Sequence, residues 1–328
     1  MTPPPTQPPT TASASKAPEL LLDLHVNFIV NLDKNKDVFE YWASDQLRLN
    51  GVYWALTALA FMSRPHELDR EEVIAFVLSC QQKNGGFGGS VDHDAHLIYT
   101  LSAIQILVTL DALERVDVER VVSYILTLHD PVVGSFTGDE WGETDTRFSY
   151  CAISALSLMG RLDAVDGDKV AEFIDRCRNF DGGYGTVPGA ESHAGQIFCC
   201  VGTLAILNHL HLVERDKLCW WLAERQLPNG GLNGRPEKLE DVCYSWWVLS
   251  ALAILDRIHW INKETLAGFI LASQDTETGG IADRPGDIPD VFHTVFGLAG
   301  LSLLEFGGLV EVDPRYCMPR GVTRRVGL

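Results

Sequence analysis

The 328-residue sequence predicts an all-α fold, an α/α toroid in which six helical hairpins form a closed α-α barrel. Three observations predict it: a glycine-rich segment recurs every 48–49 residues, an amphipathic helical segment precedes each copy, and a more apolar helical segment follows it. The apolar residues inside the five glycine-rich copies lie 49, 48, 48 and 49 residues apart, at Phe87, Phe136, Tyr184, Leu232 and Ile281. A fixed period of this length is typical of repeat architectures.

The segment before each glycine-rich copy has the apolar spacing of an outer, half-exposed helix. In the first of these segments Val73, Phe76, Val77 and Cys80 share one helical face. An aromatic residue marks the same position of every copy: Phe76, Tyr124, Phe173, Trp221 and Phe269. Glycine suits the turn that follows, because it adopts positive φ without steric cost.

The segments after the glycine-rich copies are apolar on nearly all faces, which indicates buried inner helices. They comprise residues Tyr99–Leu110, Phe148–Met159, Gln196–Leu207, Tyr244–Leu255 and His293–Leu304. One period before Tyr99 lies Gly51, within a stretch that we interpret as a degenerate first copy. Six inner helices too apolar to face water bury one another if the hairpins close into a ring. All six then start at the same end, and equivalent positions form circles around the centre.

Two of these circles are rich in aromatic side chains. One consists of Trp54, Ser102, Cys151, Cys199, Trp247 and Phe296, and the other of Tyr53, Leu101, Tyr150, Phe198, Trp246 and Val295. The simpler interpretation is that these residues fill a core. Alternatively, a wide centre with tryptophans beside small residues forms a funnel for an apolar ligand. Periodicity alone leaves both interpretations open.

Composition narrows the class of protein. The net charge of −18 argues against nucleic acid or an anionic membrane as the main partner, and no apolar stretch is long enough for a membrane span. Eight cysteines without an export signal favour a reducing, cytoplasmic setting over a disulfide framework. Residues 1–18, rich in Pro and Thr, are expected to be a disordered tail, and residues 19–328 a single toroid domain.

Ionisable residues gather where the inner helices are expected to begin. Asp241 and Cys243 precede one inner helix, and the repeat places His293 at the same level of the neighbouring one. A carboxylate, a thiol and an imidazole form a three-ligand zinc site whose fourth coordination position is open for substrate. The alternative is that Asp241 caps a helix and Cys243 fills the core.

Basic residues stand next to this candidate metal site. Arg235 and Lys238 lie on the loop before Asp241, and His193 heads the adjacent inner helix. Together with the Tyr244 hydroxyl they provide charged and neutral donors for a diphosphate. For either cation alone, an ordinary solvated loop would be the simpler interpretation.

In these motifs the chain resembles the β subunits of protein prenyltransferases, most closely those of the type II, or Rab, geranylgeranyltransferases. The resemblance covers nearly everything after residue 18. It rests on Gly51-Val52-Tyr53-Trp54, Asp145-Thr146-Arg147-Phe148, Ser192-His193-Ala194-Gly195-Gln196, Gly231-Leu232-Asn233-Gly234-Arg235-Pro236-Glu237-Lys238, Asp241-Val242-Cys243-Tyr244-Ser245-Trp246-Trp247 and Phe292-His293-Thr294.

The resemblance implies a role for residues at the matching positions. Asp241, Cys243 and His293 would hold one catalytic zinc ion. The geranylgeranyl diphosphate site would comprise His193, Ala194, Gly195, Arg235, Lys238, Tyr244, Ser245, Trp246, Trp247, Trp54 and Tyr150, with Arg235, Lys238 and Tyr244 also acting in catalysis. The implied activity is transfer of geranylgeranyl to C-terminal cysteine thiols of Rab GTPases.

The resemblance also implies partners and two points of detail. The partners are a helical-repeat α subunit, with which this chain forms a heterodimer, and an escort protein that presents the Rab substrate. Asp283 is a candidate ligand for magnesium on the diphosphate. Asn50 departs from the type II pattern, which has a smaller residue there, and so bears on the length of isoprenoid accepted.

Other functions remain open from the sequence. The farnesyl and type I geranylgeranyl enzymes have similar β subunits, although these tend to be longer. A terpene cyclase shares the helical ring but needs an acidic proton donor, and the chain has no Asp-x-Asp-Asp motif. A non-catalytic toroid would use the same residues only for capping and filling. Metal content separates a transferase from the cyclase and the non-catalytic toroid: about one zinc per chain favours the transferase, and none favours the other two.

Overall fold

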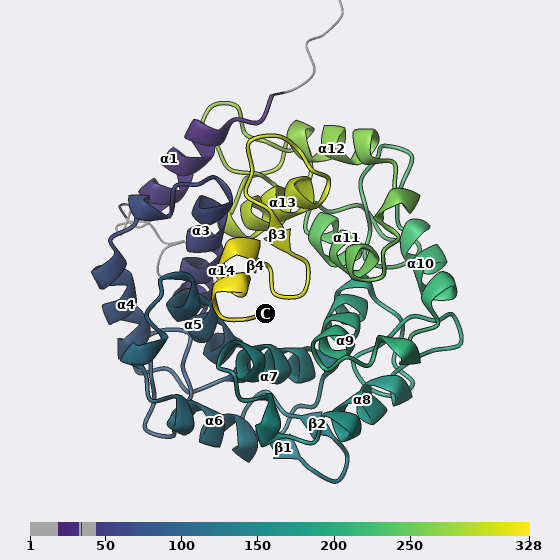
Figure 1. Ribbon diagram of the computed structural model, residues 1–328. Coiled ribbons are helices and arrows are strands. Elements are labelled where there is room, and N and C mark those ends of the chain that lie inside the picture. The colour runs from purple at the N-terminus through teal and green to yellow at the C-terminus, as the bar shows by residue number, and fades with distance from the viewer. Residues whose placement is uncertain (1–18, 33, 35–43) are drawn as a thin grey trace, which may run out of the picture.

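A computed structural model describes residues 19–32, 34 and 44–328, and the tail predicted for residues 1–18 lies outside this range. Helices dominate the described chain and form two concentric rings (Figure 1). The predicted α/α toroid of six hairpins is therefore confirmed. No helix of the described ranges combines the length and the apolar character needed to cross a bilayer.

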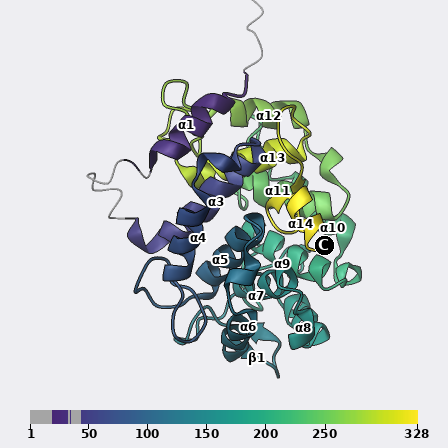
Figure 2. The same cartoon turned by 60° about the vertical axis from the view of Figure 1, so that its left-hand side comes forward.

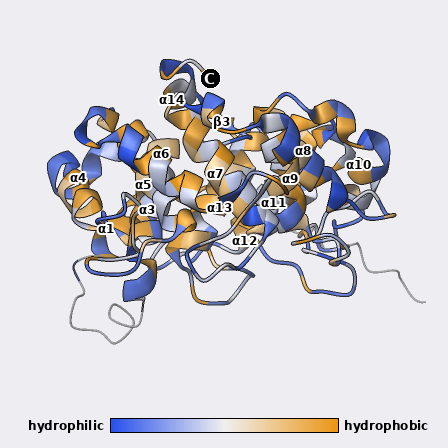
Figure 3. Ribbon diagram, turned by 90° about the horizontal axis from the view of Figure 1, so that it is seen from below, coloured by the Kyte–Doolittle hydropathy of each residue, from blue (hydrophilic) through white to orange (hydrophobic). Residues whose placement is uncertain are grey.

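The inner ring consists of the six predicted apolar helices. They are α3 (Arg48–Phe61), α5 (Leu97–Thr109), α7 (Thr146–Leu158), α9 (Ala194–Ile206), α11 (Tyr244–Ile254) and α13 (Val291–Leu303). Each packs against the next, and α13 packs against α3 to close the ring. Most of their side chains are buried, and the ribbon in Figure 3 shows many hydrophobic residues along these helices.

The outer ring covers the inner one. Its helices are α1 (Leu22–Leu32), α4 (Arg70–Ser79), α6 (Val118–Thr127), α8 (Gly167–Arg176), α10 (Arg215–Ala223) and α12 (Lys263–Ala272). Most begin at an N-cap whose side chain accepts a backbone hydrogen bond: Asp69, Asp117, Asp166 and Asn262. A short 3₁₀ turn, η1 (Asp45–Leu47), precedes the inner helix α3. Five others precede the outer helices α4, α6, α8, α10 and α12: η2 (Pro65–Glu67), η3 (Leu113–Arg115), η4 (Leu162–Ala164), η5 (Leu210–Leu212) and η6 (Ile258–Trp260).

The glycine-rich loops explain why the hairpins stack at a fixed distance. Gly85, Gly134 and Gly230 have positive φ, and a Cβ on any of them would collide with a backbone carbonyl of the next outer helix. Gly279 meets Leu24 of α1 in the same way, so that α1 acts as the outer helix that joins the last repeat to the first (Figure 2). Glycine is required here because the backbones themselves are in contact.

A C-terminal hairpin closes one end of the ring, which the repeat did not predict. It comprises β3 (Val312–Asp313), β4 (Met318–Pro319) and α14 (Arg320–Arg325), near the centre of Figure 1. Three consecutive carbonyls, of Arg315, Tyr316 and Cys317, accept hydrogen bonds from Tyr150, Gln105 and Tyr53, at 2.7, 2.9 and 3.0 Å. A second small pair, β1 (His129–Asp130) with β2 (Ser135–Phe136), lies in one glycine-rich loop.

Candidate metal and diphosphate site

The inner helices begin at equivalent positions, as the repeat predicts. Side chains of His96, Asp145, His193 and Asp290 cap α5, α7, α9 and α13. Asp241 occupies the same position of the fifth repeat, and its carboxylate accepts a hydrogen bond from the Cys243 N–H at 2.7 Å. Regular helix starts only at Tyr244, so that Asp241 and Cys243 lie on an irregular first turn.

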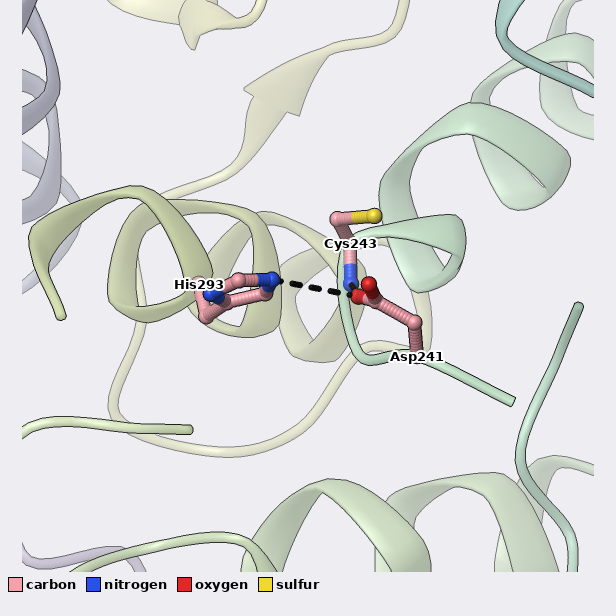
Figure 4. Close-up of side chains that lie close together, drawn as sticks. All are labelled: Asp241, Cys243 and His293. Carbon is pink, nitrogen blue, oxygen red and sulfur yellow. Dashed lines mark hydrogen bonds and ion pairs between the residues drawn. The ribbon is translucent and has the colours of Figure 1, made fainter. Parts of the chain in front are cut away.

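Asp241, Cys243 and His293 form the predicted cluster (Figure 4). One ligand atom from each lies within 4.8 Å of the others, and His293 Nε2 is 3.3 Å from Asp241 Oδ1. Cys243 is buried, whereas the other two are half-buried at the mouth of the ring. The three residues therefore lie close enough for one ion to contact all of them.

Asp290 orients the imidazole of this cluster. Its Oδ2 is 2.6 Å from His293 Nδ1, and its Oδ1 accepts a hydrogen bond from the His293 N–H at 2.8 Å. With Nδ1 engaged by a carboxylate, Nε2 is the nitrogen that faces Asp241 and Cys243. A carboxylate behind a histidine ligand is the usual support in metal sites. The repeat alignment placed Asp290 at this level but did not predict its role.

The electrostatics of the cluster favour a cation at its centre. Burial lowers the pKa of His293, but hydrogen bonds to Asp241 and Asp290 outweigh it and raise the pKa to about 9. Burial opposes ionisation of Asp241 too, yet the hydrogen bonds from His293 and Cys243 hold its pKa below the ordinary value. Burial and the nearby Asp241 charge raise the pKa of the Cys243 thiol. An imidazolium thus supplies positive charge that a metal ion would otherwise provide.

The donor set fits zinc. Oxygen, sulfur and nitrogen donors from three side chains are typical of catalytic zinc sites, which keep a fourth position open. The sulfur of Cys243 argues against magnesium or calcium, because these ions prefer oxygen ligands.

A cavity of about 310 Å³ adjoins the cluster. It is lined by His193, Gly234, Arg235, Lys238, Leu239, Glu240, Asp241, Tyr244, Asp283 and Arg284. The four residues predicted to bind diphosphate are therefore brought together, as predicted. Arg284 is a third cation that sequence reasoning missed, although it lies next to Asp283.

The His193 imidazole is neutral, and its Nε2–H is the hydrogen-bond donor. Its Nδ1 accepts a hydrogen bond from the Gly195 N–H at 3.1 Å, so Nε2 carries the proton and faces the Tyr244 hydroxyl at 3.2 Å. Burial and the Arg235 charge lower the pKa of His193, while Glu191 raises it less. Burial also raises the pKa of Tyr244 to about 12, which keeps its hydroxyl protonated.

The cations of the cavity differ in their partners. Arg235 pairs with Glu191 at 2.6 Å, and Arg284 pairs with Asp283 at 2.8 Å. Lys238 forms no ion pair with any carboxylate among the described residues. A bound diphosphate would thus meet one unpaired ammonium and two guanidiniums already held by carboxylates. Asp283 reaches the cavity, but its carboxylate is shared with Arg284.

Three predicted binding residues lie behind the cavity wall. The Ala194 N–H donates to the Gly234 carbonyl at 2.8 Å, and the Gly195 N–H is used by His193. Ser245 is fully buried, and its Cβ faces Gly300 of the adjacent helix. The N–H groups of Ala194 and Gly195 are used in these hydrogen bonds, and packing buries Ser245, so none of the three residues lines the cavity.

A continuous aromatic wall leads away from the metal cluster. Phe292 contacts His293, Trp54 and Phe296, with ring centroids 4.7–5.1 Å apart. The wall continues through Trp247 and Phe198 to Tyr150, with centroid distances of 4.7, 5.3 and 4.9 Å. Trp246 is fully buried and backs Phe198 and Phe296. Phe198 and Phe296 stood in the predicted circles, whereas Phe292 was missed as a wall residue.

Asn50 is held in place at the level of the wall. It is buried, and its Oδ1 accepts a hydrogen bond from the Ser102 hydroxyl at 2.8 Å. The polar pair therefore joins α3 to α5, and its space is not available to a ligand without breaking that bond.

Comparison with known proteins agrees with this geometry. Residues 20–318 match the family model of the prenyltransferase alpha-alpha toroid domain. The chain is 54% identical over 312 residues to the geranylgeranyl transferase type-2 subunit beta of Saccharomyces cerevisiae, covering 93% of this chain and 96% of that protein. It is 52% identical over 317 residues to geranylgeranyl transferase type-2 subunit beta 1 of Arabidopsis thaliana, covering 97% and 98%.

Solved structures agree on the fold. Candida albicans protein geranylgeranyltransferase-I, complexed with GGPP, superposes with a TM-score of 0.85 at 23% identity and covers 94% of this chain and 98% of that one. A type II terpene cyclase from Scytonema superposes less well, with a TM-score of 0.62 at 12% identity over 88% of this chain and 98% of that one. The matching family model and the sequence relatives show that the chain belongs to the prenyltransferase alpha-alpha toroid family.

Proposed function

We propose that the chain is the catalytic β subunit of a type II protein geranylgeranyltransferase. The observation that carries the proposal is that three features adjoin one another. A candidate metal site shares Asp241 with a cavity lined by cations, and an aromatic wall begins at His293 of the metal site. Relatives named as geranylgeranyl transferase type-2 β subunits, with identities above half, support the same activity.

The protein substrate would offer C-terminal cysteine thiols of a Rab GTPase. Asp241, Cys243 and His293 would hold one zinc ion, with Asp290 fixing the histidine ring. Zinc held by these residues would lower the pKa of a substrate thiol bound to it, which would make thiolate available near neutral pH. Deprotonation of Cys243 is coupled to zinc binding, because a thiolate is the form that binds metal.

The cavity residues would act on the leaving group. A carbon–sulfur bond forms as the C1–O bond of geranylgeranyl diphosphate breaks, and diphosphate departs with the bonding electrons. Arg235 and Lys238 would stabilise the charge that grows on the diphosphate, and His193 and Tyr244 would donate neutral hydrogen bonds. Magnesium held by Asp283 would add positive charge, although Arg284 already supplies some there.

The aromatic wall would hold the isoprenoid. Trp54, Trp247 and Tyr150 present large apolar faces, and burying an isoprenoid against them stabilises binding by about 25 cal/mol per Å² of apolar surface. The carbonyl of Arg315 holds the Tyr150 hydroxyl at the closed end of the ring. The lipid would thus enter at the mouth and extend toward the C-terminal hairpin.

The mouth itself would be covered by partners. Trp141 and Ile288 lie on loops that lead into α7 and α13, and their side chains are 82% and 89% exposed. Large apolar side chains exposed around one opening mark an interaction surface. The proposed partners are an α subunit and an escort protein that presents the Rab. The cytoplasm is the proposed location, since all eight cysteines are unpaired.

Transfer of radiolabelled geranylgeranyl to a Rab tests the function. The chain would be assayed with and without an α subunit and escort protein, and with farnesyl diphosphate as the competing donor. We expect transfer only from the full assembly, a preference for the geranylgeranyl donor, and one zinc per chain. Zinc-free protein with undiminished transfer, or preferred transfer of farnesyl, would contradict the proposal.

A further inference from the structure

Arg225 is a buried cation next to the diphosphate cavity but outside its lining. It follows α10, and only 5% of its surface is exposed. Its guanidinium lies over the Trp221 ring, with Cζ 4.5 Å from the centroid, and its Nε donates to the Trp221 carbonyl at 3.1 Å. No carboxylate of the described chain forms an ion pair with it. Burial of a cation without a counter-ion costs free energy.

The other repeats act as internal controls for this position. After each of the five outer helices α4, α6, α8, α10 and α12, a backbone carbonyl accepts a hydrogen bond from an N–H of the following loop at 2.9–3.2 Å. The residues that supply this carbonyl are Cys80, Leu128, Cys177, Arg225 and Ser273. All five are buried, and only Arg225 is charged. The charge is therefore specific to the repeat that also carries Arg235 and Lys238.

The residue whose N–H donates this backbone hydrogen bond also differs in the Arg225 repeat from its equivalents in the other repeats. The donors are Gly88, Thr137, Gly185, Asn233 and Ala282, so the amide side chain occurs only opposite Arg225. Asn233 is 2% exposed. Its Oδ1 accepts from Arg225 at 3.4 Å, and its Nδ2 donates to the Lys238 carbonyl at 2.8 Å. A chain of contacts thus runs from Arg225 through Asn233 to the loop that lines the cavity.

Arg225 also keeps its charge although it is buried. Burial lowers its pKa, while the charges of Glu224 and Asp181 raise it, and an arginine remains cationic at neutral pH under these conditions. The buried Asn233 links this cation to the loop that lines the cavity, and charges interact more strongly through buried protein groups than through water. An anion in the cavity would therefore gain attraction from a charge that it does not contact.

We propose that Arg225 is a positioning residue for the diphosphate: through Asn233 it fixes the segment 233–238, and its unpaired charge is compensated when diphosphate binds. The inference rests on the proposed function and deepens it. It assigns to this repeat an inner support that the other four repeats do not have. The position of Lys238 in the cavity then depends on a residue that follows the outer helix α10.

Binding measurements on the complete assembly test the inference. Arg225→Ser introduces the residue that the next repeat carries, and Ser273→Ala is the matched control there. We expect Arg225→Ser to weaken geranylgeranyl diphosphate binding and raise its KM by about tenfold. Three other quantities should stay unchanged: the zinc content, the KM for the protein substrate, and the affinity for geranylgeraniol. Geranylgeraniol lacks the diphosphate and so reports on the lipid site alone. Ser273→Ala should change none of these quantities.

Two further variants separate support from charge. Arg225→Lys keeps the charge but loses the fixed guanidinium fork, so we expect an intermediate affinity for the diphosphate. Asn233→Ala keeps Arg225 and removes the bond to the Lys238 carbonyl. If the two residues act through one another, the double variant Arg225→Ser/Asn233→Ala loses less diphosphate-binding free energy than the sum of the two single losses.

Several outcomes would overturn the inference. Equal diphosphate affinity in Arg225→Ser and unaltered protein would do so, as would an equal loss of geranylgeraniol binding, which would show a merely structural role. Additive losses in the double variant would exclude the link through Asn233. If the unaltered assembly bound no geranylgeranyl diphosphate, the proposed function would fail together with this inference. If the unaltered assembly binds geranylgeranyl diphosphate normally, a failed prediction for the Arg225 variants overturns this inference alone and leaves the proposed function standing.

Discussion

Cys243 is the softest and most buried donor of the metal cluster, and its replacement tests the metal most directly. We expect Cys243→Ala to lose zinc and to reduce transfer by at least about 100-fold, because a missing ligand weakens both binding and orientation of the metal. Metal analysis and single-turnover rates measure the effect. Cys219→Ala, at a buried thiol on α10, is the control that should keep its zinc.

Arg235 is the residue at which rate and binding can be separated. In the free chain its guanidinium pairs with Glu191, so it must exchange or share that partner when diphosphate binds. We expect Arg235→Ala to lower the single-turnover rate by about 10- to 100-fold, the value of a hydrogen bond to a charged group. Glu191→Gln should leave the rate within about threefold, because exposed ion pairs contribute little. An unchanged rate in Arg235→Ala would contradict its role at the leaving group.

The individual residues show where sequence reasoning succeeds. Asp241, Cys243 and His293 could be brought together from the sequence, because the repeat places equivalent positions at one level of a ring. Asp290 and Phe292 come shortly before His293 in the sequence, yet their roles depend on side-chain directions that periodicity does not specify. Ala194, Gly195 and Ser245 belong to the right strings of sequence, but the first two use their N–H groups in other hydrogen bonds, and packing buries Ser245 away from the cavity.

At the scale of elements, the C-terminal hairpin depends on one buried carboxylate. Asp313 accepts hydrogen bonds from Arg315, at 2.9 Å from Nη2 to Oδ2, and from the Thr323 hydroxyl at 3.0 Å. Burial raises the pKa of Asp313, but these hydrogen bonds outweigh burial and hold the pKa below the ordinary value. The ionised form therefore stabilises the fold.

This depressed pKa fixes the direction of a pH effect. The stabilisation is complete above the pKa of the unfolded carboxyl, about 4, and is lost as the pH falls through the lower pKa of the folded state. We expect Asp313→Asn to lower the free energy of unfolding by about 3 kcal/mol at neutral pH, with a smaller difference below about pH 3. Urea unfolding at several pH values measures both. Glu311→Gln, at an exposed pair with Arg320, should cost less than about 1 kcal/mol.

The elements also show the limits of the repeat. The outer and inner helices could be predicted because each recurs with the same apolar spacing. The hairpin that closes one end occurs once, carries short strands, and is held by Tyr53, Gln105 and Tyr150 from three different repeats. A pattern that occurs once cannot be recognised by self-similarity.

For the whole molecule, the closure of the ring is the feature most open to test. A Cβ at Gly279 would collide with the Leu24 carbonyl, and its φ of +77° disfavours any other residue. We expect Gly279→Ala to lower the free energy of unfolding by about 3 kcal/mol, measured by urea unfolding. Gly268→Ala is the matched control, because Gly268 lies in α12 with open space around it. That change should stabilise the helix by up to about 1 kcal/mol.

The junction at Gly279 joins residues from opposite ends of the described chain. His25 Nδ1 accepts from the Gly280 N–H at 2.9 Å across 255 positions, and Gln274 accepts from the Leu21 N–H at 2.9 Å. During synthesis the earlier hairpins can stack in order. The contacts between α1 and the last repeat cannot form until that repeat has left the ribosome. The nascent protein therefore passes through an open horseshoe with apolar inner helices exposed at both of its ends. Loop closure of such length is slow, so the last step of folding is the one that most needs protection from aggregation.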